Sequence, residues 1–140
     1  MKKTALAIGL PVAFLLTGCA ATTPEPAATP SAPAPVEVRY EVDFETTHPQ
    51  WVKKGPTADI TYETPTGTQQ QNADLPVRSK GTGEEGLKMS FPAGAFVYIS
   101  AQKDENYGEV TCRIYANEKL ISENTASGKY SIATCKGTAR

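Results

Sequence analysis

Apolar and polar residues alternate along several short segments after residue 35. Between Val36 and Phe44 every second residue is apolar, and the residues between them are charged. A period of two residues is typical of a β-strand with one buried face. Similar alternation, or a short apolar run, predicts further strands at 58–63, 75–79, 87–91, 95–101, 109–116, 120–125 and 130–135. The 75–79 strand is expected at a sheet edge because it contains Pro76.

Turn-forming residues separate these segments. None of the segments shows a helical period with helix caps. The turns are expected at 64–67, 92–94, 117–118 and 126–128. Short strands at roughly ten-residue spacing are typical of antiparallel sandwiches and barrels. We therefore predict an all-β fold, a small Ig-like β-sandwich of seven or eight antiparallel strands with one disulfide; a small barrel is the alternative.

The first 18 residues have the composition of an export signal rather than of a folded element. Lys2 and Lys3 precede a 12-residue apolar stretch, which is shorter than the roughly 17–25 residues of a membrane-spanning helix. The stretch ends in Leu16-Thr17-Gly18-Cys19, which resembles a bacterial lipobox. In that motif small residues precede the cleavage point and the thiol of Cys19 carries diacylglycerol. The alternative is an ordinary secretory signal in which Cys19 is incidental.

Residues 19–35 are expected to form a lipidated cysteine followed by a disordered tether. Five of the residues from 20 to 35 are Pro, six are Ala, and Glu25 is the single charge. Such a segment favours extended polyproline-II conformations and reaches up to ~50 Å. A proline-rich ligand for another domain is the alternative. Residues 36–140 are then the folded β-sandwich domain.

The charge balance bears on possible partners. The chain has 14 Lys and Arg residues against 15 Asp and Glu residues, a formal net charge of −1. Cleavage before Cys19 removes two lysines, so the mature form carries −3. This balance argues against a nucleic-acid partner, which would require a basic face. Membrane attachment is expected through the acyl chains on Cys19.

With Cys19 assigned to lipid, Cys112 and Cys135 remain. They lie in neighbouring predicted strands of an exported domain, where disulfides form and persist. We predict a structural disulfide that closes a 24-residue loop, worth roughly 3 kcal/mol. A redox or metal-binding pair is the alternative, although the spacing is not of the CxxC kind.

The remaining candidates for chemistry are weak. Residues 81–86 match G-x-G-x-x-G, but a predicted strand follows where dinucleotide binding requires a helix. His48 is the single histidine and has no evident nucleophile beside it. Trp51 is expected either to cap the core or to contact a partner or lipid. We therefore predict no enzymatic activity, no catalytic residues, no cofactor and no metal site.

The order of several segments resembles the MmpS family, the mycobacterial membrane proteins small. The resemblance is carried by Ala58–Tyr62, Gly67–Gln71, Val97–Gln102, Val110–Tyr115, Glu118–Leu120, Glu123–Gly128 and Ala133–Cys135. It implies an exported β-sandwich with one disulfide that assists an MmpL transporter of the resistance-nodulation-division (RND) type, an exporter of lipids or siderophores. Here a lipobox replaces the family's transmembrane helix. Val77 stands where an aromatic residue is expected, and the 45–57 connection is longer.

Two functions are expected from these observations. The first is a lipid-anchored accessory protein on the extracytoplasmic face of the plasma membrane, which binds an RND-type transporter or its lipidic cargo. The second is an envelope-binding lipoprotein module that recognises cell-wall polymer or another surface protein.

Overall fold

Eight β-strands form the part of the chain that the computed structural model describes, residues 32–48, 55–77 and 85–140. In chain order they are β1 (Val36–Glu45), β2 (Thr57–Thr64), β3 (Gly67–Asp74), β4 (Leu87–Phe91), β5 (Phe96–Lys103), β6 (Glu109–Ala116), β7 (Lys119–Ser127) and β8 (Ile132–Thr138). These residues contain no helix long and apolar enough to cross a bilayer. The predicted all-β fold is confirmed, with eight strands.

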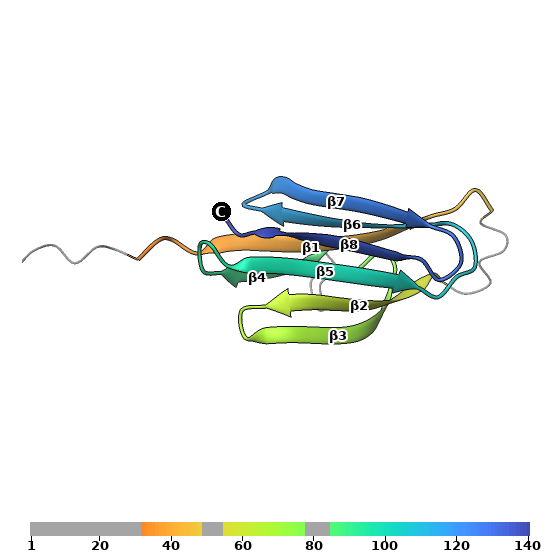
Figure 1. The fold of residues 1–140 in the computed structure, drawn as a ribbon, viewed down its shortest axis with the longest axis horizontal. Coiled ribbons are helices and arrows are strands. Elements are labelled where there is room, and N and C mark those ends of the chain that lie inside the picture. The colour runs from red at the N-terminus through yellow and green to blue at the C-terminus, as the bar shows by residue number, and fades with distance from the viewer. Residues whose placement is uncertain (1–31, 49–54, 78–84) are drawn as a thin grey trace, which may run out of the picture. The chain divides into compact units, whose positions relative to one another are not determined.

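The strands form two four-stranded antiparallel sheets, β4-β1-β6-β7 and β3-β2-β5-β8 (Figure 1). The central strands are β1 and β6 in one sheet and β2 and β5 in the other. In Figure 1, β7 and the β2–β3 hairpin lie on opposite sides of this domain.

The core lies between the two sheets and follows from the alternation in the sequence. Every second side chain of β5 and β6 is buried, and the same holds for most of β1. The fully buried side chains include Val38, Tyr40, Val42, Ile60, Val97, Ile99, Val110, Cys112 and Ile114. Burial of this apolar area is the main stabilising contribution to folding.

The hairpin after β2 differs from the prediction. A strand was expected at 75–79, but Leu75–Val77 follow β3 without strand structure, and residues 78–79 lie outside the described residues. The actual strand, Gly67–Asp74, is polar on both faces and mostly exposed. Leu75 and Val77 are buried because they pack into the core after the strand has ended. Their apolar character therefore reflects packing of a connection, not a strand face.

The two sheets are linked covalently by the predicted disulfide between Cys112 and Cys135. Cys112 lies in β6 and Cys135 in β8, so the partners belong to opposite sheets rather than to paired strands. Side chains of β7 add hydrogen bonds to β8. Asn124 Nδ2 donates to the Thr134 carbonyl at 3.3 Å, and the Lys136 amide donates to Ser122 Oγ at 3.3 Å. The sandwich is thus closed along its β7–β8 side.

The turn at Asn117-Glu118 joins β6 to β7, as predicted. Both residues have positive φ, 48° and 63°, as a type I′ turn requires. The turn is also tied to β1: the Asn117 amide donates to the Glu37 carbonyl at 2.8 Å, and the Glu37 amide donates to Asn117 Oδ1 at 3.1 Å. Bonding on both sides of the turn fixes the end of the hairpin against its neighbouring strand.

Candidate functional site

A pocket of about 410 Å³ lies at the end of the β4-β1-β6-β7 sheet. It is lined by Glu45, Thr46, Thr47, Gly108, Glu109, Ser127 and Gly128. The register places Glu45 directly opposite Glu109, and both are exposed. Two like charges in this position repel each other. The pocket therefore offers two carboxylates and three hydroxyls to a ligand, with a local excess of negative charge.

The loop beside this pocket is fixed by a buried lysine. Lys103 is fully buried, and its Nζ donates to the carbonyl oxygens of Glu105 at 2.8 Å and Tyr107 at 2.9 Å. Burial lowers the pKa of Lys103, and the carboxylate of Glu105 opposes part of that shift. The ammonium group thus fixes the backbone of the β5–β6 loop by hydrogen bonds from the core. The next residue after this loop segment, Gly108, lines the pocket.

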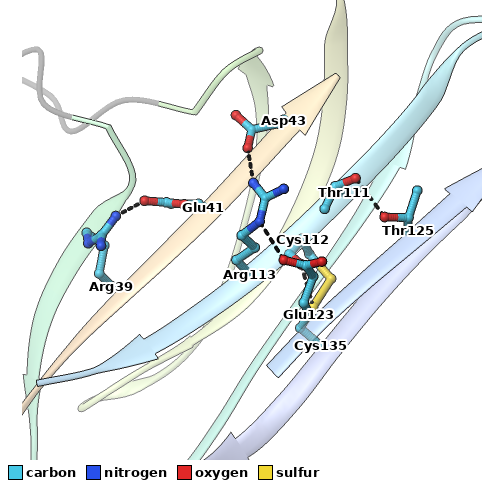
Figure 2. A network of polar contacts seen from close by, with 9 residues as sticks. All are labelled: Arg39, Glu41, Asp43, Thr111, Cys112, Arg113, Glu123, Thr125 and Cys135. Carbon is cyan, nitrogen blue, oxygen red and sulfur yellow. Dashed lines mark hydrogen bonds and ion pairs between the residues drawn. A yellow bond between two sulfur atoms is a disulfide. The ribbon is translucent and has the colours of Figure 1, made fainter. Parts of the chain in front are cut away.

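Arg113 forms the centre of a polar network on the outer face of the β4-β1-β6-β7 sheet (Figure 2). Its Nε donates to Glu123 Oε2 at 2.8 Å, and its Nη1 pairs with Asp43. The bond to Glu123 raises the pKa of Arg113; partial burial opposes this, and Asp43 adds to the increase. Thr111 and Thr125 are hydrogen-bonded at 2.8 Å beside it. These side chains connect β1, β6 and β7 across the sheet.

Arg39 forms a second polar cluster on the same face. It pairs with Glu41 and, through Nη2, with Glu118 Oε2 at 3.0 Å. Its guanidinium carbon also lies 4.1 Å from the centroid of the Tyr115 ring, a cation–π contact. The positive charges of both arginines are therefore balanced by carboxylates of the chain itself. The face carries charges of both signs, and most of them are paired.

The hydroxyl of Tyr40 is a buried polar group within the core. It has no hydrogen bond of good geometry among the described residues. Its ring packs against Tyr62 and Phe91, at centroid distances of 6.1 and 6.4 Å. Burial raises the pKa of Tyr40 well above its ordinary value; the nearby backbone of Tyr98 lowers it slightly, and Glu63 raises it further. The phenol therefore stays protonated in the folded state.

Of the sequence-predicted site residues, Cys112 and Cys135 are brought together in the disulfide described above. Cys19 and Trp51 lie outside the described residues, as do the signal segment and most of the tether. His48 is exposed at the end of the segment that follows β1. The G-x-G-x-x-G match ends at Gly86, which donates to the Val77 carbonyl at 2.8 Å and is followed by β4, a strand. The described end of the motif thus precedes a strand, whereas a dinucleotide site requires a helix N-terminus at this point.

Sequence reasoning missed the pocket and Lys103. The facing of Glu45 and Glu109 depends on a strand register between distant residues, which no local pattern contains. Lys103, in contrast, continues the buried series Val97, Ile99, Ala101 at the same two-residue step. The two-residue spacing therefore indicates that Lys103 points into the core, although a lysine in this position is more often the start of a loop.

The fold and these clusters define a disulfide-linked, eight-stranded antiparallel β-sandwich with a small acidic pocket at one end. No family model matches the chain, and no curated protein is significantly similar to it in sequence. Residues 32–48, 55–77 and 85–140 contain no group of three or more His, Cys, Asp or Glu side chains placed to hold a metal ion. The resemblance to the MmpS family accordingly remains an expectation based on the sequence segments given above.

Proposed function

We propose that this protein is a lipid-anchored accessory protein of the extracytoplasmic membrane face, which binds rather than catalyses. The disulfide between Cys112 and Cys135 is the observation that carries the proposal. Structural disulfides persist in oxidising compartments outside the cytoplasm. Together with the signal-like segment ending at Cys19, this bond supports export of the chain and its attachment by lipid.

The outer face of the β4-β1-β6-β7 sheet supports a binding role. Arg39 pairs with Glu41 of its own strand and with Glu118 of the β6–β7 turn. Arg113 pairs with Asp43 and Glu123 of the two neighbouring strands, so the face carries both signs of charge in fixed positions. Fixed charge patterns of this type give specificity and orientation to protein docking. The resemblance to the MmpS family supports an RND-type, MmpL-like exporter of lipids or siderophores as the partner, or its lipidic cargo.

The anchor is tested by fractionating cells that produce the full chain or its Cys19→Ala variant. The wild type is expected in the membrane fraction with an acyl-modified N-terminal cysteine, detected by mass spectrometry. The variant is expected to leave the membrane fraction, because acyl chains supply the binding free energy at ~0.8 kcal/mol per buried CH₂. Quantitative sedimentation of the variant with membranes would refute the anchor.

The partner is tested by cross-linking in cells followed by mass spectrometry. An export pump among the cross-linked proteins supports the accessory function. Arg113→Gln is a useful variant because it removes the charge that joins Asp43 to Glu123 while leaving an unbranched polar side chain on the same face. It is expected to weaken the pump cross-link, whereas Lys129→Gln, an exposed change outside this face, is expected to leave it unchanged. Cross-links to wall proteins or glycan alone would refute the proposal.

An aromatic pair on the opposite sheet supports the second candidate, an envelope-binding module. Phe96 is 58% exposed and stacks on Tyr98, with ring centroids 6.3 Å apart and an interplanar angle of 24°. Exposed aromatic rings bury large apolar area when a partner covers them. Binding to purified wall polymer that falls in Phe96→Ala, with no pump among the cross-linked proteins, would favour this second function over the first.

A further inference from the structure

The four edge strands of the sandwich differ in how well their edges are protected against pairing with another chain. Natural sheets protect edges by short strands, lysine, proline, bulges or a covering element. β4 has only five residues and carries Lys88. β7 carries Lys119 and an irregular register opposite β6. The edge of β8 is covered by hydrogen bonds from Ser122 and Asn124 of β7.

Within residues 32–48, 55–77 and 85–140, β3 has none of these protections. It is eight residues long, Gly67–Asp74, and contains no lysine, arginine or proline. Its register with β2, its only strand partner among the described residues, is unbroken, and most of its residues are exposed. Figure 1 shows β3 along the outer side of its sheet. It is therefore an edge that accepts a further strand.

The hydrogen bonds at the end of β3 show which backbone groups face outward. The Leu75 amide donates to the Pro56 carbonyl at 2.9 Å, so the backbone of Leu75 faces β2. In an antiparallel ladder the backbone groups alternate in direction from residue to residue. The amides and carbonyls on the free edge are consequently those of Thr68, Gln70, Asn72 and Asp74.

We propose that β3 pairs antiparallel with β3 of a second copy of this chain, with Gln71 on the two-fold axis. In this register Thr68 lies opposite Asp74 of the second copy, and Gln70 opposite Asn72. All four outward-facing residues then exchange backbone hydrogen bonds in pairs. The two four-stranded sheets become one continuous eight-stranded sheet. Such an isologous contact is self-complementary by symmetry.

Charge favours this partner and this orientation. Asp74 is the only charged residue of β3, and it stands at the end of the strand. Antiparallel pairing separates the two Asp74 carboxylates by the length of the strand and places each opposite Thr68, an uncharged residue whose hydroxyl donates to Glu63 at 2.6 Å. Parallel pairing would bring the two carboxylates together, where like charges repel. Between these ends Gln70 lies opposite Asn72 and Gln71 opposite its own copy, and these side-chain amides can hydrogen-bond across the contact without any charge to satisfy.

The proposal is tested with Gln71→Cys in the full chain, oxidised in the producing cells without fractionation. Non-hydrogen-bonded pairs in antiparallel sheets have Cα atoms about 4.5 Å apart, within the range a disulfide bridges. A dimer linked through position 71 is expected on a non-reducing gel. Gln102→Cys, exposed in β5 of the same sheet but away from its edge, is the matched control and is expected to give no dimer.

A second substitution separates edge pairing from chance collision. Gln70→Pro removes an amide from the free edge without removing a bond to β2. Introduced beside Gln71→Cys, it is expected to abolish the dimer while the Cys112–Cys135 bond still forms. If that variant does not fold, Gln70→Lys replaces it, with Gln102→Lys as the control. A dimer that persists in the Gln70→Pro or Gln70→Lys variant, or no homodimer in Gln71→Cys, would overturn the proposal, which does not depend on the proposed function.

Discussion

Gly108 is the position where adding a single methyl group has the clearest expected cost. It lies at the pocket wall with a φ of 77°, a backbone conformation that L-residues rarely adopt. A Cβ on Gly108 would lie 2.5 Å from Cζ of Phe44 and 2.7 Å from the carbonyl oxygen of Glu45. The conformational cost is about 1–2 kcal/mol, and overpacking adds about 1–3 kcal/mol. Gly108→Ala is therefore expected to lower the free energy of unfolding by about 2–5 kcal/mol.

Two alanine variants separate these contributions. Gly94 also has a positive φ, 87°, but a Cβ there would meet nothing within 4 Å, so Gly94→Ala is expected to cost about 1–2 kcal/mol. Gly55 has neither constraint, and Gly55→Ala is expected to be neutral or slightly stabilising. Guanidinium-induced unfolding followed by far-UV circular dichroism measures all three. A Gly108→Ala cost no larger than that of Gly94→Ala would refute the contact with Phe44 and Glu45.

Three further predictions concern the disulfide, the core and a turn. Replacing both Cys112 and Cys135 by Ala is expected to lower the free energy of unfolding by about 3 kcal/mol, which corresponds to a fall in Tm of roughly 12 °C or more. A loss below about 1 kcal/mol would contradict the stabilisation expected from closing the 24-residue loop. Because folding raises the pKa of Tyr40, the unfolded state loses the phenol proton first, so the contribution of this group to stability is complete below pH 10 and is lost as the pH rises further. Tyr40→Phe is therefore expected to flatten the decline of the urea-unfolding free energy at alkaline pH. A decline as steep as in the wild type would count against the burial of the phenol. Glu118→Gly is expected to raise Tm, because it relieves a φ of 63° with a gain of about 0.5–1 kcal/mol, and the exposed ion pair with Arg39 that it removes contributes little. A lower Tm would show that the ion pair contributes more than the backbone strain costs.

Much of the fold could be predicted because most strands bury one face. Val36–Phe44 and Glu109–Ala116 alternate in the sequence because their inward residues form the core, and both strands are found where the pattern predicts them. β3 could not be predicted in this way, since Gln69 and Gln71 on its inward side are not covered well enough to require apolar residues. Its existence follows from backbone pairing with β2, which leaves no trace in hydrophobic periodicity.

The side-chain clusters were less accessible to sequence reasoning than the strands. The pairing of Cys112 with Cys135 follows from the number of cysteines, but their positions in opposite sheets depend on β8 joining β5 rather than β7. The network around Arg113 likewise requires the registers of β1 and β7 with β6, which bring Asp43 and Glu123 to it from 70 and 10 residues away. Sequence spacing alone contains neither relation.

The bond between β6 and β8 also determines how the domain responds to mechanical tension. If force is applied between Ala32 and Arg140, it enters at β1 and leaves through β8. The bond from Cys112 to Cys135 carries the load past the chain between them, so β7 bears no tension while the bond is intact. The 23-residue separation would otherwise release about 80 Å of extended chain. The oxidised domain is therefore a shorter and stiffer link under load than the reduced one.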